Sequence, residues 1–270
     1  MNETALEMRE ATLRYGNVSV VADISFALSC GEIVGIAGSN GAGKSSLLRL
    51  ACREQSPSEG RIWLAGEDLA TVRPRDRARR MAVLPQHMHL QFDFTVQQVV
   101  ALGRSPHGDG ENAGKAIVEN LLDTCELRHL AGRSYQSLSG GEQQRTQYAR
   151  VLAQLLRKQP DEDLRGQVLV LDEPTASLDI RHQEQLVHTL KSLRHRGCAV
   201  LVVMHDINLL SRCADRLLFL KKGRMQSLAA TAEQLRETTL SELFGFPMKV
   251  QPRDDGDLPL VYPDPAHHAF

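Results

Sequence analysis

A glycine-rich octapeptide, GSNGAGKS at residues 38–45, constrains the fold of this chain more than any other feature. It follows a short apolar run at residues 32–37 and precedes an amphipathic stretch at residues 43–54. The apolar run predicts a buried strand and the amphipathic stretch predicts a helix with its leucines turned inward. The glycines allow the sharp turn between them. The sequence therefore predicts a strand–loop–helix unit inside a sheet that is covered on both faces.

The rest of the chain alternates apolar runs with amphipathic stretches. Further buried strands are expected at residues 168–171, 199–204 and 216–220. This alternation is typical of a mostly parallel sheet flanked by helices, which is the α/β class.

Two regions depart from that alternation. Between residues 87 and 153 the strand signal is weak, and helices are expected over 96–103, 113–125 and 141–156. A helical subdomain inserted into the α/β core is the simplest interpretation. The tail over 251–270 contains four prolines and is expected to be irregular.

The composition is that of an ordinary globular protein. The 270 residues are 42% apolar and 24% charged, with a formal net charge of −1. A near-neutral chain lacks the basic excess that drives nucleic-acid binding, so we expect no nucleic-acid partner. No apolar run approaches the roughly 18 to 20 residues of a membrane-spanning helix, and the polar N-terminus predicts no signal peptide. The five widely spaced cysteines favour reduced core thiols over disulfides or a metal site.

The octapeptide predicts a phosphate-binding loop. Its glycines let successive backbone N–H groups point at phosphate oxygens, and the following helix adds the positive end of its dipole. Lys44 is expected to reach the β- and γ-phosphates, and the Ser45 hydroxyl to bind Mg²⁺. The expected ATP contacts are Gly38, Ser39, Asn40, Gly41, Ala42, Gly43, Lys44, Ser45 and Ser46.

Two adjacent carboxylates follow the predicted strand at 168–171. The carboxyl ends of parallel strands are where sheets of this class bind ligands. Asp172 is placed to hold Mg²⁺, and Glu173 to polarise a water toward the γ-phosphate. Together with the octapeptide, this pair predicts a P-loop NTPase.

A third motif narrows the class. LSGGEQQR at residues 138–145 closely resembles the signature sequence of the ATP-binding-cassette (ABC) ATPases, and Ser139 can cap the helix that follows. The start of the capped helix exposes the backbone N–H groups of Gly140 and Gly141, which can form a second anion site. The resemblance implies that this site closes over the ATP held by another subunit. It therefore implies a head-to-tail homodimer with ATP between the subunits, contacted in trans by Ser139, Gly140, Gly141, Glu142 and Asp179.

Smaller motifs follow in the order that this family shows. Tyr15 resembles the aromatic residue that stacks on adenine, and residues 177–179, which end at Asp179, resemble the D-loop. Gln86 resembles the Q-loop glutamine that senses Mg²⁺, and His205 resembles the switch histidine that contacts the γ-phosphate. The resemblance thus implies catalytic roles for Glu173, His205 and Gln86, and Mg²⁺ ligation by Ser45, Gln86 and Asp172.

The resemblance extends over residues 5–225 and implies the domain organisation. We expect a nucleotide-binding core at 1–86 and 154–230 with an antiparallel β subdomain at its N-terminus. A helical subdomain with the signature is expected at 87–153, and a C-terminal extension at 231–270.

The chain resembles a single cassette without a membrane span, which implies two separate permease subunits and a peripheral position on the cytoplasmic face of the inner membrane. Residues 84–107 resemble the importer branch for iron chelates, cobalamin and haem, where this region receives the permease. Phe92 and Phe94 are candidates for apolar contacts there, and core packing is the alternative. The long polar link at 156–167 resembles the link of haem importers, so the resemblance implies a haem importer, whose periplasmic haem-binding protein would act on this chain only indirectly.

Two other functions stay open: a siderophore or cobalamin importer subunit, and a non-transport ABC ATPase. A basic cluster is expected on a solvated helix rather than against nucleic acid or lipid, and comprises Arg73, Arg75, Arg77, Arg79 and Arg80. His87 and His89 lack a third ligand and are not expected to bind a metal or haem. His267 and His268 would bind a metal only opportunistically.

Overall fold

The structure is a computed structural model that describes residues 3–86, 88, 90, 92–108, 111–156, 162–253 and 258–266. Its central element is a six-stranded sheet with the order β10-β9-β3-β8-β7-β6, in which all pairs are parallel except β9 with β10. The strands are β3 (Ile33–Ala37), β6 (Met81–Leu84), β7 (Val168–Asp172), β8 (Ala199–Val203), β9 (Arg216–Lys221) and β10 (Arg224–Ala230). Every residue of β3, β7 and β8 is buried, as their continuous apolar sequences predicted.

A second, antiparallel sheet forms the N-terminal part of the chain. It has the order β2-β1-β4-β5, with β1 (Thr4–Tyr15), β2 (Val18–Ser29), β4 (Glu59–Leu64) and β5 (Glu67–Asp68). Helix α1 (Lys44–Ala51) packs between the two sheets, because Leu47 shares one apolar core with Ile24 of β2 and Leu201 of β8. The expected antiparallel β subdomain is therefore confirmed.

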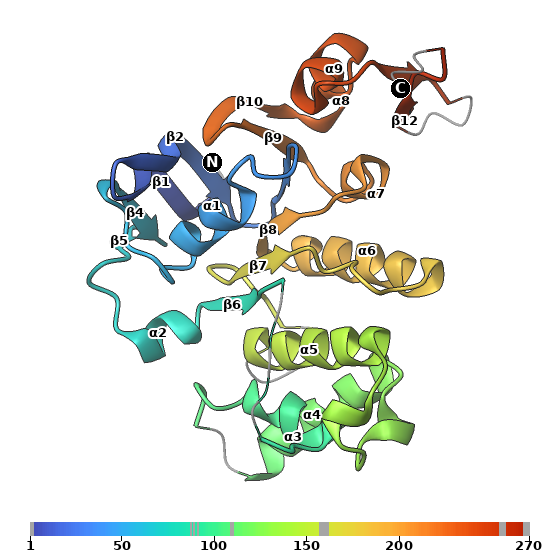
Figure 1. Cartoon of the computed structure of the whole chain (residues 1–270). Coiled ribbons are helices and arrows are strands. Elements are labelled where there is room, and N and C mark those ends of the chain that lie inside the picture. The colour runs from blue at the N-terminus through green and yellow to red at the C-terminus, as the bar shows by residue number, and fades with distance from the viewer. Residues whose placement is uncertain are drawn as a thin grey trace.

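The helical region lies between β6 and β7 in sequence and at one end of the molecule in Figure 1. It contains α3 (Val96–Leu102), α4 (Glu111–Thr124), α5 (Gly140–Leu155) and two short 3-10 helices, η1 (Arg128–Leu130) and η2 (Tyr135–Ser137). Helix α5 packs against β6 on one side and against α3 and α4 on the other. The signature motif thus begins the helix that connects the helical region to the core.

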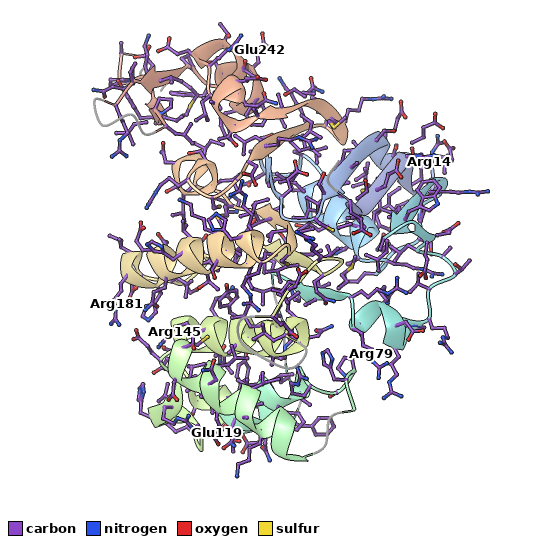
Figure 2. The ribbon with its side chains drawn as sticks, turned by 180° about the vertical axis from the view of Figure 1, so that it is seen from behind. Arg14, Arg79, Glu119, Arg145, Arg181 and Glu242 are labelled. Atoms are coloured by element: carbon purple, nitrogen blue, oxygen red, sulfur yellow. The ribbon has the colours of Figure 1, made fainter. Side chains whose placement is uncertain are left out.

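The remaining helices flank the sheet and build the C-terminal end. They are α2 (Pro74–Ala78), α6 (Ile180–His195), α7 (Ile207–Ser211), α8 (Thr231–Gln234) and α9 (Glu237–Phe244). Helix α2 has no buried residue, as the basic cluster predicted, but the Arg79 guanidinium, labelled in Figure 2, donates to Pro106 O over 2.8 Å. All five cysteines are free thiols. Across the described segments, none of the helices is apolar over the length needed to cross a bilayer.

The prediction of an irregular tail is wrong in part. Strands β11 (Met248–Gln251) and β12 (Leu260–Pro263) pair as an antiparallel hairpin. Prolines suggested disorder because they cannot donate to a ladder, but they are tolerated at strand ends, and Pro263 stands at the end of β12. The hairpin continues the C-terminal elements that lie beyond β9 and β10 in Figure 1.

Candidate active site

The glycine-rich loop connects β3 to α1 at the carboxyl edge of the parallel sheet. Gly41 and Gly43 have φ values of 75° and 101°, where side chains are strained. A Cβ atom at Gly38 would lie 2.2 Å from Leu220 O, and one at Gly43 would lie 2.8 Å from Val20 O. The glycines are therefore required both by the turn and by the close approach of β9 and β2.

Lys44 extends back over this loop. Its Nζ donates to Gly38 O over 2.9 Å and to Ser39 O over 3.1 Å. Burial lowers the pKa of the Lys44 ammonium, and the nearby charges of Glu173 and Asp172 oppose this shift. The loop thus holds a positive charge where the motif predicts phosphate.

One pocket brings together the loop and three residues from other strand ends. Its lining comprises Val20, Asn40, Gly41, Gly43, Lys44, Ser45, Ser46, Gln86, Glu173 and His205. Gln86 follows β6, Glu173 follows β7 and His205 follows β8. Parallel strand order places their carboxyl ends at one edge, which is why residues so distant in sequence meet here.

Asp172 lies beside Ser45 in the adjoining pocket, which Gln86 also lines. It is 8% exposed, and its Oδ1 has no hydrogen-bond partner among the described residues. Burial raises the pKa of the Asp172 carboxyl, a hydrogen bond from Ser45 lowers it, and the charge of Glu173 raises it further. A buried carboxylate oxygen without a partner, next to a hydroxyl and an amide, is a donor set that fits Mg²⁺.

The Glu173 carboxylate is held from both sides. Gln86 Nε2 donates to Glu173 Oε2 over 2.6 Å, and His205 Nε2 lies 2.5 Å from Glu173 Oε1. Glu173 also has a φ of 52°, in the left-handed region, and its backbone N–H donates to Val203 O over 3.0 Å. Backbone and side-chain contacts together fix this carboxylate in the lining of the pocket.

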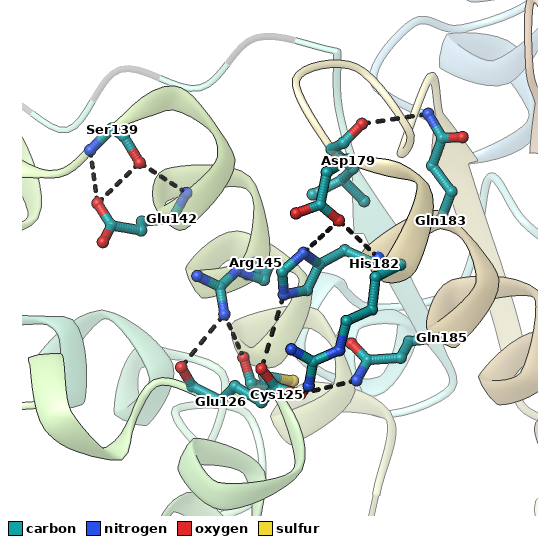
Figure 3. A network of polar contacts seen from close by, with 11 residues as sticks. Cys125, Glu126, Ser139, Glu142, Arg145, Asp179, His182, Gln183 and Gln185 are labelled. Carbon is teal, nitrogen blue, oxygen red and sulfur yellow. Dashed lines mark hydrogen bonds and ion pairs between the residues drawn. The ribbon is translucent and has the colours of Figure 1, made fainter.

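The signature residues form a helix cap, which Figure 3 shows. Ser139 Oγ accepts from Glu142 N over 3.4 Å, and Glu142 Oε2 accepts from Ser139 N over 2.8 Å. A Cβ atom at Gly141 would lie 2.9 Å from Ser177 O, so the D-loop approaches the signature closely. None of the described residues that line the phosphate-loop pocket belongs to this cap. The two candidate anion sites are therefore separate within one chain.

Asp179 caps the neighbouring helix α6. Its Oδ1 accepts from His182 N over 2.9 Å and lies 2.7 Å from His182 Nδ1. His182 in turn faces Glu126, with Nε2 3.9 Å from Glu126 Oε2. Figure 3 shows this chain of polar contacts between the D-loop and the end of α4.

The Glu126 cluster was not predicted from the sequence. Arg181 pairs with the Glu126 carboxylate, and Gln185 Nε2 donates to it over 2.8 Å. The Arg145 guanidinium donates to Cys125 O over 3.1 Å and to Glu126 O over 3.2 Å. Figure 2 shows Arg145 and Arg181 at the same end of the facing helices α5 and α6. No local pattern marks Glu126, because its partners come from other helices.

The aromatic candidates occupy different settings. Tyr15 ends β1 with half of its surface exposed, and its hydroxyl bonds to Gln55. Phe92 is 69% exposed, whereas Phe94 packs against the core, and their rings meet edge to face at 6.1 Å. Phe94 therefore takes part in core packing, and the ring of Phe92 is left exposed. His87, His89, His267, His268 and residues 157–161 of the polar link lie outside the described residues.

The sequence matches the family described as ABC transporter over residues 21–176. The hemin import ATP-binding protein HmuV of Pseudomonas entomophila is 45% identical over 95% of this chain and 98% of its own length. HmuV of Pseudomonas aeruginosa is 43% identical over the same shares.

Solved structures give the same grouping. A metal-chelate type ABC transporter in an inward-facing conformation has a TM-score of 0.78 at 26% identity, over 97% of both chains. An ATP-binding subunit of an ABC transporter has a TM-score of 0.77 at 23% identity, over 89% of this chain and 98% of that one, which supports the fold alone. With the fold, the family match and these relatives in agreement, this chain belongs to the ABC transporter family.

Proposed function

We propose that this chain is the ATP-hydrolysing subunit of an ABC importer for haem. The observation that carries the proposal is the 45% identity to a hemin import ATP-binding protein over 95% of the chain. The phosphate loop, Gln86, Glu173 and His205 line one pocket, and this arrangement supports an active ATPase. A siderophore or cobalamin importer is the alternative from the sequence, and these relatives favour haem over it.

ATP binding begins at the phosphate loop. Lys44 exchanges its contacts with Gly38 O and Ser39 O for the β- and γ-phosphates, and the loop N–H groups bind phosphate oxygens. Ser45, Asp172 and Gln86 would hold Mg²⁺, and the ion would supply positive charge that neutralises the phosphates. The exposed ring of Tyr15 is available to stack on adenine.

Hydrolysis requires that Glu173 accept a proton from the attacking water. In the observed arrangement both carboxylate oxygens are engaged, one by Gln86 and one by His205. Each carboxylate oxygen keeps a second lone pair that can accept a hydrogen bond from the attacking water. We infer that the γ-phosphate attracts His205 away from Glu173, so that bound ATP itself completes the catalytic arrangement.

The second anion site acts on another subunit's ATP. The Ser139 cap, Gly140, Gly141 and Glu142 lie apart from the phosphate-loop pocket of the same chain, and the adjacent D-loop carries Asp179. Ile180, next to it, is 79% exposed, as an interface residue would be in the free subunit. A head-to-tail homodimer would bring each signature over the partner's nucleotide.

Transport itself requires a permease of two transmembrane subunits. The exposed Phe92 lies in the region between β6 and α3, and we propose that its side chain contacts the permease. The position that we propose for the chain is therefore peripheral, on the cytoplasmic face of the inner membrane. A periplasmic haem-binding protein would deliver haem to the permease and never touch this chain.

Growth of a deletion strain tests the proposal. A strain that lacks this chain should fail to grow on haem as sole iron source and should grow normally on free iron salts. Wild-type protein should restore growth on haem, and Glu173→Gln should not. Normal growth on haem with loss of siderophore or cobalamin use would contradict haem as the substrate and leave the ATPase intact.

A further inference from the structure

The C-terminal extension packs against the segment that follows His205. In Figure 1, α9 and the β11–β12 hairpin lie beyond β9, and β12 contacts α7. Val250 pairs with Val261 inside the hairpin, and Met248 N donates to Ser241 Oγ of α9 over 2.8 Å. Val261 is 5% exposed and shares an apolar core with the leucines of α7. Strand β12 therefore joins the apolar core through Val261.

The side chain of Asn208 joins α7 to this hairpin. Its Nδ2 donates to Val261 O over 2.9 Å, and its Oδ1 accepts from Val261 N over 2.8 Å. A primary amide offers one donor group and one acceptor, which match the acceptor and donor of a peptide backbone. Turning the amide over would set donor against donor and acceptor against acceptor. Asparagine therefore satisfies both contacts in a single orientation.

Helix α7 links this pair of hydrogen bonds to the active site. Asp206 caps the helix, with Oδ1 accepting from Asn208 N over 2.8 Å and from Leu209 N over 3.2 Å. His205 directly precedes the cap. Helix α7 spans only five residues, and so short a helix depends on tertiary contacts for its position. Asn208 supplies such a contact within the first turn.

We propose that Asn208 is a positioning residue through which the C-terminal hairpin holds α7, and thereby sets the position of His205 in the phosphate-loop pocket. The inference rests on the proposed role of His205 in ATP hydrolysis and gives the C-terminal extension a part in that reaction. Asn208 is absent from the described lining of the phosphate-loop pocket, and of that lining it acts only on His205, so most of the ATP contacts should persist without it.

Asn208→Asp is the most discriminating substitution. Aspartate keeps the size of the side chain and the acceptor for Val261 N, but it sets an oxygen against Val261 O. We expect kcat for ATP hydrolysis by the purified chain to fall roughly tenfold, because His205 would be misplaced once this part-buried pair of hydrogen bonds is disturbed. The dissociation constant for ATP should stay within about twofold of wild type, since P-loop contacts are unchanged. Lys249→Gln is the matched control, because it removes ion pairs of the same hairpin and leaves the amide contacts in place.

Removal of β12 tests whether the hairpin acts through Asn208. A chain that ends after Gln251 should show the same fall in kcat as Asn208→Asp. Combining the truncation with Asn208→Asp should produce no further fall, because residues that act as a unit are not additive. Additive losses would mean that the two changes act independently, and would overturn the proposal.

Thermal unfolding and ATP binding separate positioning from mere stability. The proposal is overturned if folded Asn208→Asp hydrolyses ATP at the wild-type rate. It is equally overturned if kcat and ATP affinity fall together with a large drop in Tm. Failure of the wild-type chain to hydrolyse ATP would instead contradict the proposed function, so the two failures are distinguishable.

Discussion

Gln86 Nε2 donates to Glu173 Oε2 over 2.6 Å although the two residues are 87 positions apart in sequence. The contact follows from the sheet, because β6 and β7 are parallel neighbours with Leu84 opposite Leu171. Each of the two side chains stands two residues beyond its paired leucine. His205 contacts the other oxygen of the same carboxylate. Residues that follow β6, β7 and β8 therefore meet at Glu173.

Glu173→Gln should stop turnover and leave ATP binding intact. The amide keeps the shape of the side chain but cannot accept a proton from water, so phosphate release should fall at least about 100-fold. Size-exclusion chromatography should show an ATP-bound dimer, because the dimer dissociates only after ATP is hydrolysed. Hydrolysis at the wild-type rate would show that Glu173 is not the base.

Lys44→Ala should abolish tight ATP binding. The ammonium that now contacts Gly38 O and Ser39 O is the cation of the loop. Its loss should weaken binding about 30-fold or more, corresponding to roughly 2 kcal/mol for a charge-assisted contact. Equilibrium binding of labelled ATP measures this, with Lys222→Ala, a change outside the described pocket lining, as the control. Affinity near that of wild type would rule out the assigned role of Lys44.

Ser139→Arg should separate nucleotide loading from hydrolysis. The cap lies outside the described lining of the pocket in its own chain, so a lone subunit should still bind ATP with wild-type affinity. The arginine fills the second anion site and should prevent closure of the dimer and turnover. Loss of ATP binding by the variant subunit would contradict the trans arrangement.

Phe92→Glu and Phe94→Glu should behave differently. Phe92 is 69% exposed, so its substitution should leave Tm and basal ATPase activity unchanged and should reduce stimulation by the permease. Phe94 packs on the core with its side chain partly buried, and a charge there should lower Tm. Thermal unfolding and permease-stimulated ATPase assays compare the pair. Unfolding caused by Phe92→Glu would place that ring in the core instead.

Much of the fold could be predicted because its signals are local. The phosphate loop, the buried strands and the Ser139 cap each depend on residues that are close in sequence. The hairpin was not predicted because the prolines of the tail indicated irregular structure. The β pattern in the tail is short, and the hairpin depends on packing of β12 against α7. Asn208 contacts a residue that is 53 positions away, and Glu126 contacts residues of separate helices. Contacts between residues so distant in sequence produce no local pattern from which they could be predicted. Phe92 and Phe94 could not be distinguished because only tertiary packing decides which ring is buried.

ATP-dependent haem uptake into vesicles tests the central claim most directly. The chain, its permease and a haem-loaded binding protein would be reconstituted, and haem that enters the lumen would be measured with ATP on the side of this chain. Uptake should require ATP, stop with Glu173→Gln, and not be competed by cobalamin or a ferric siderophore. Uptake of cobalamin or a siderophore in place of haem, or haem uptake that persists with Glu173→Gln, would contradict the proposed function.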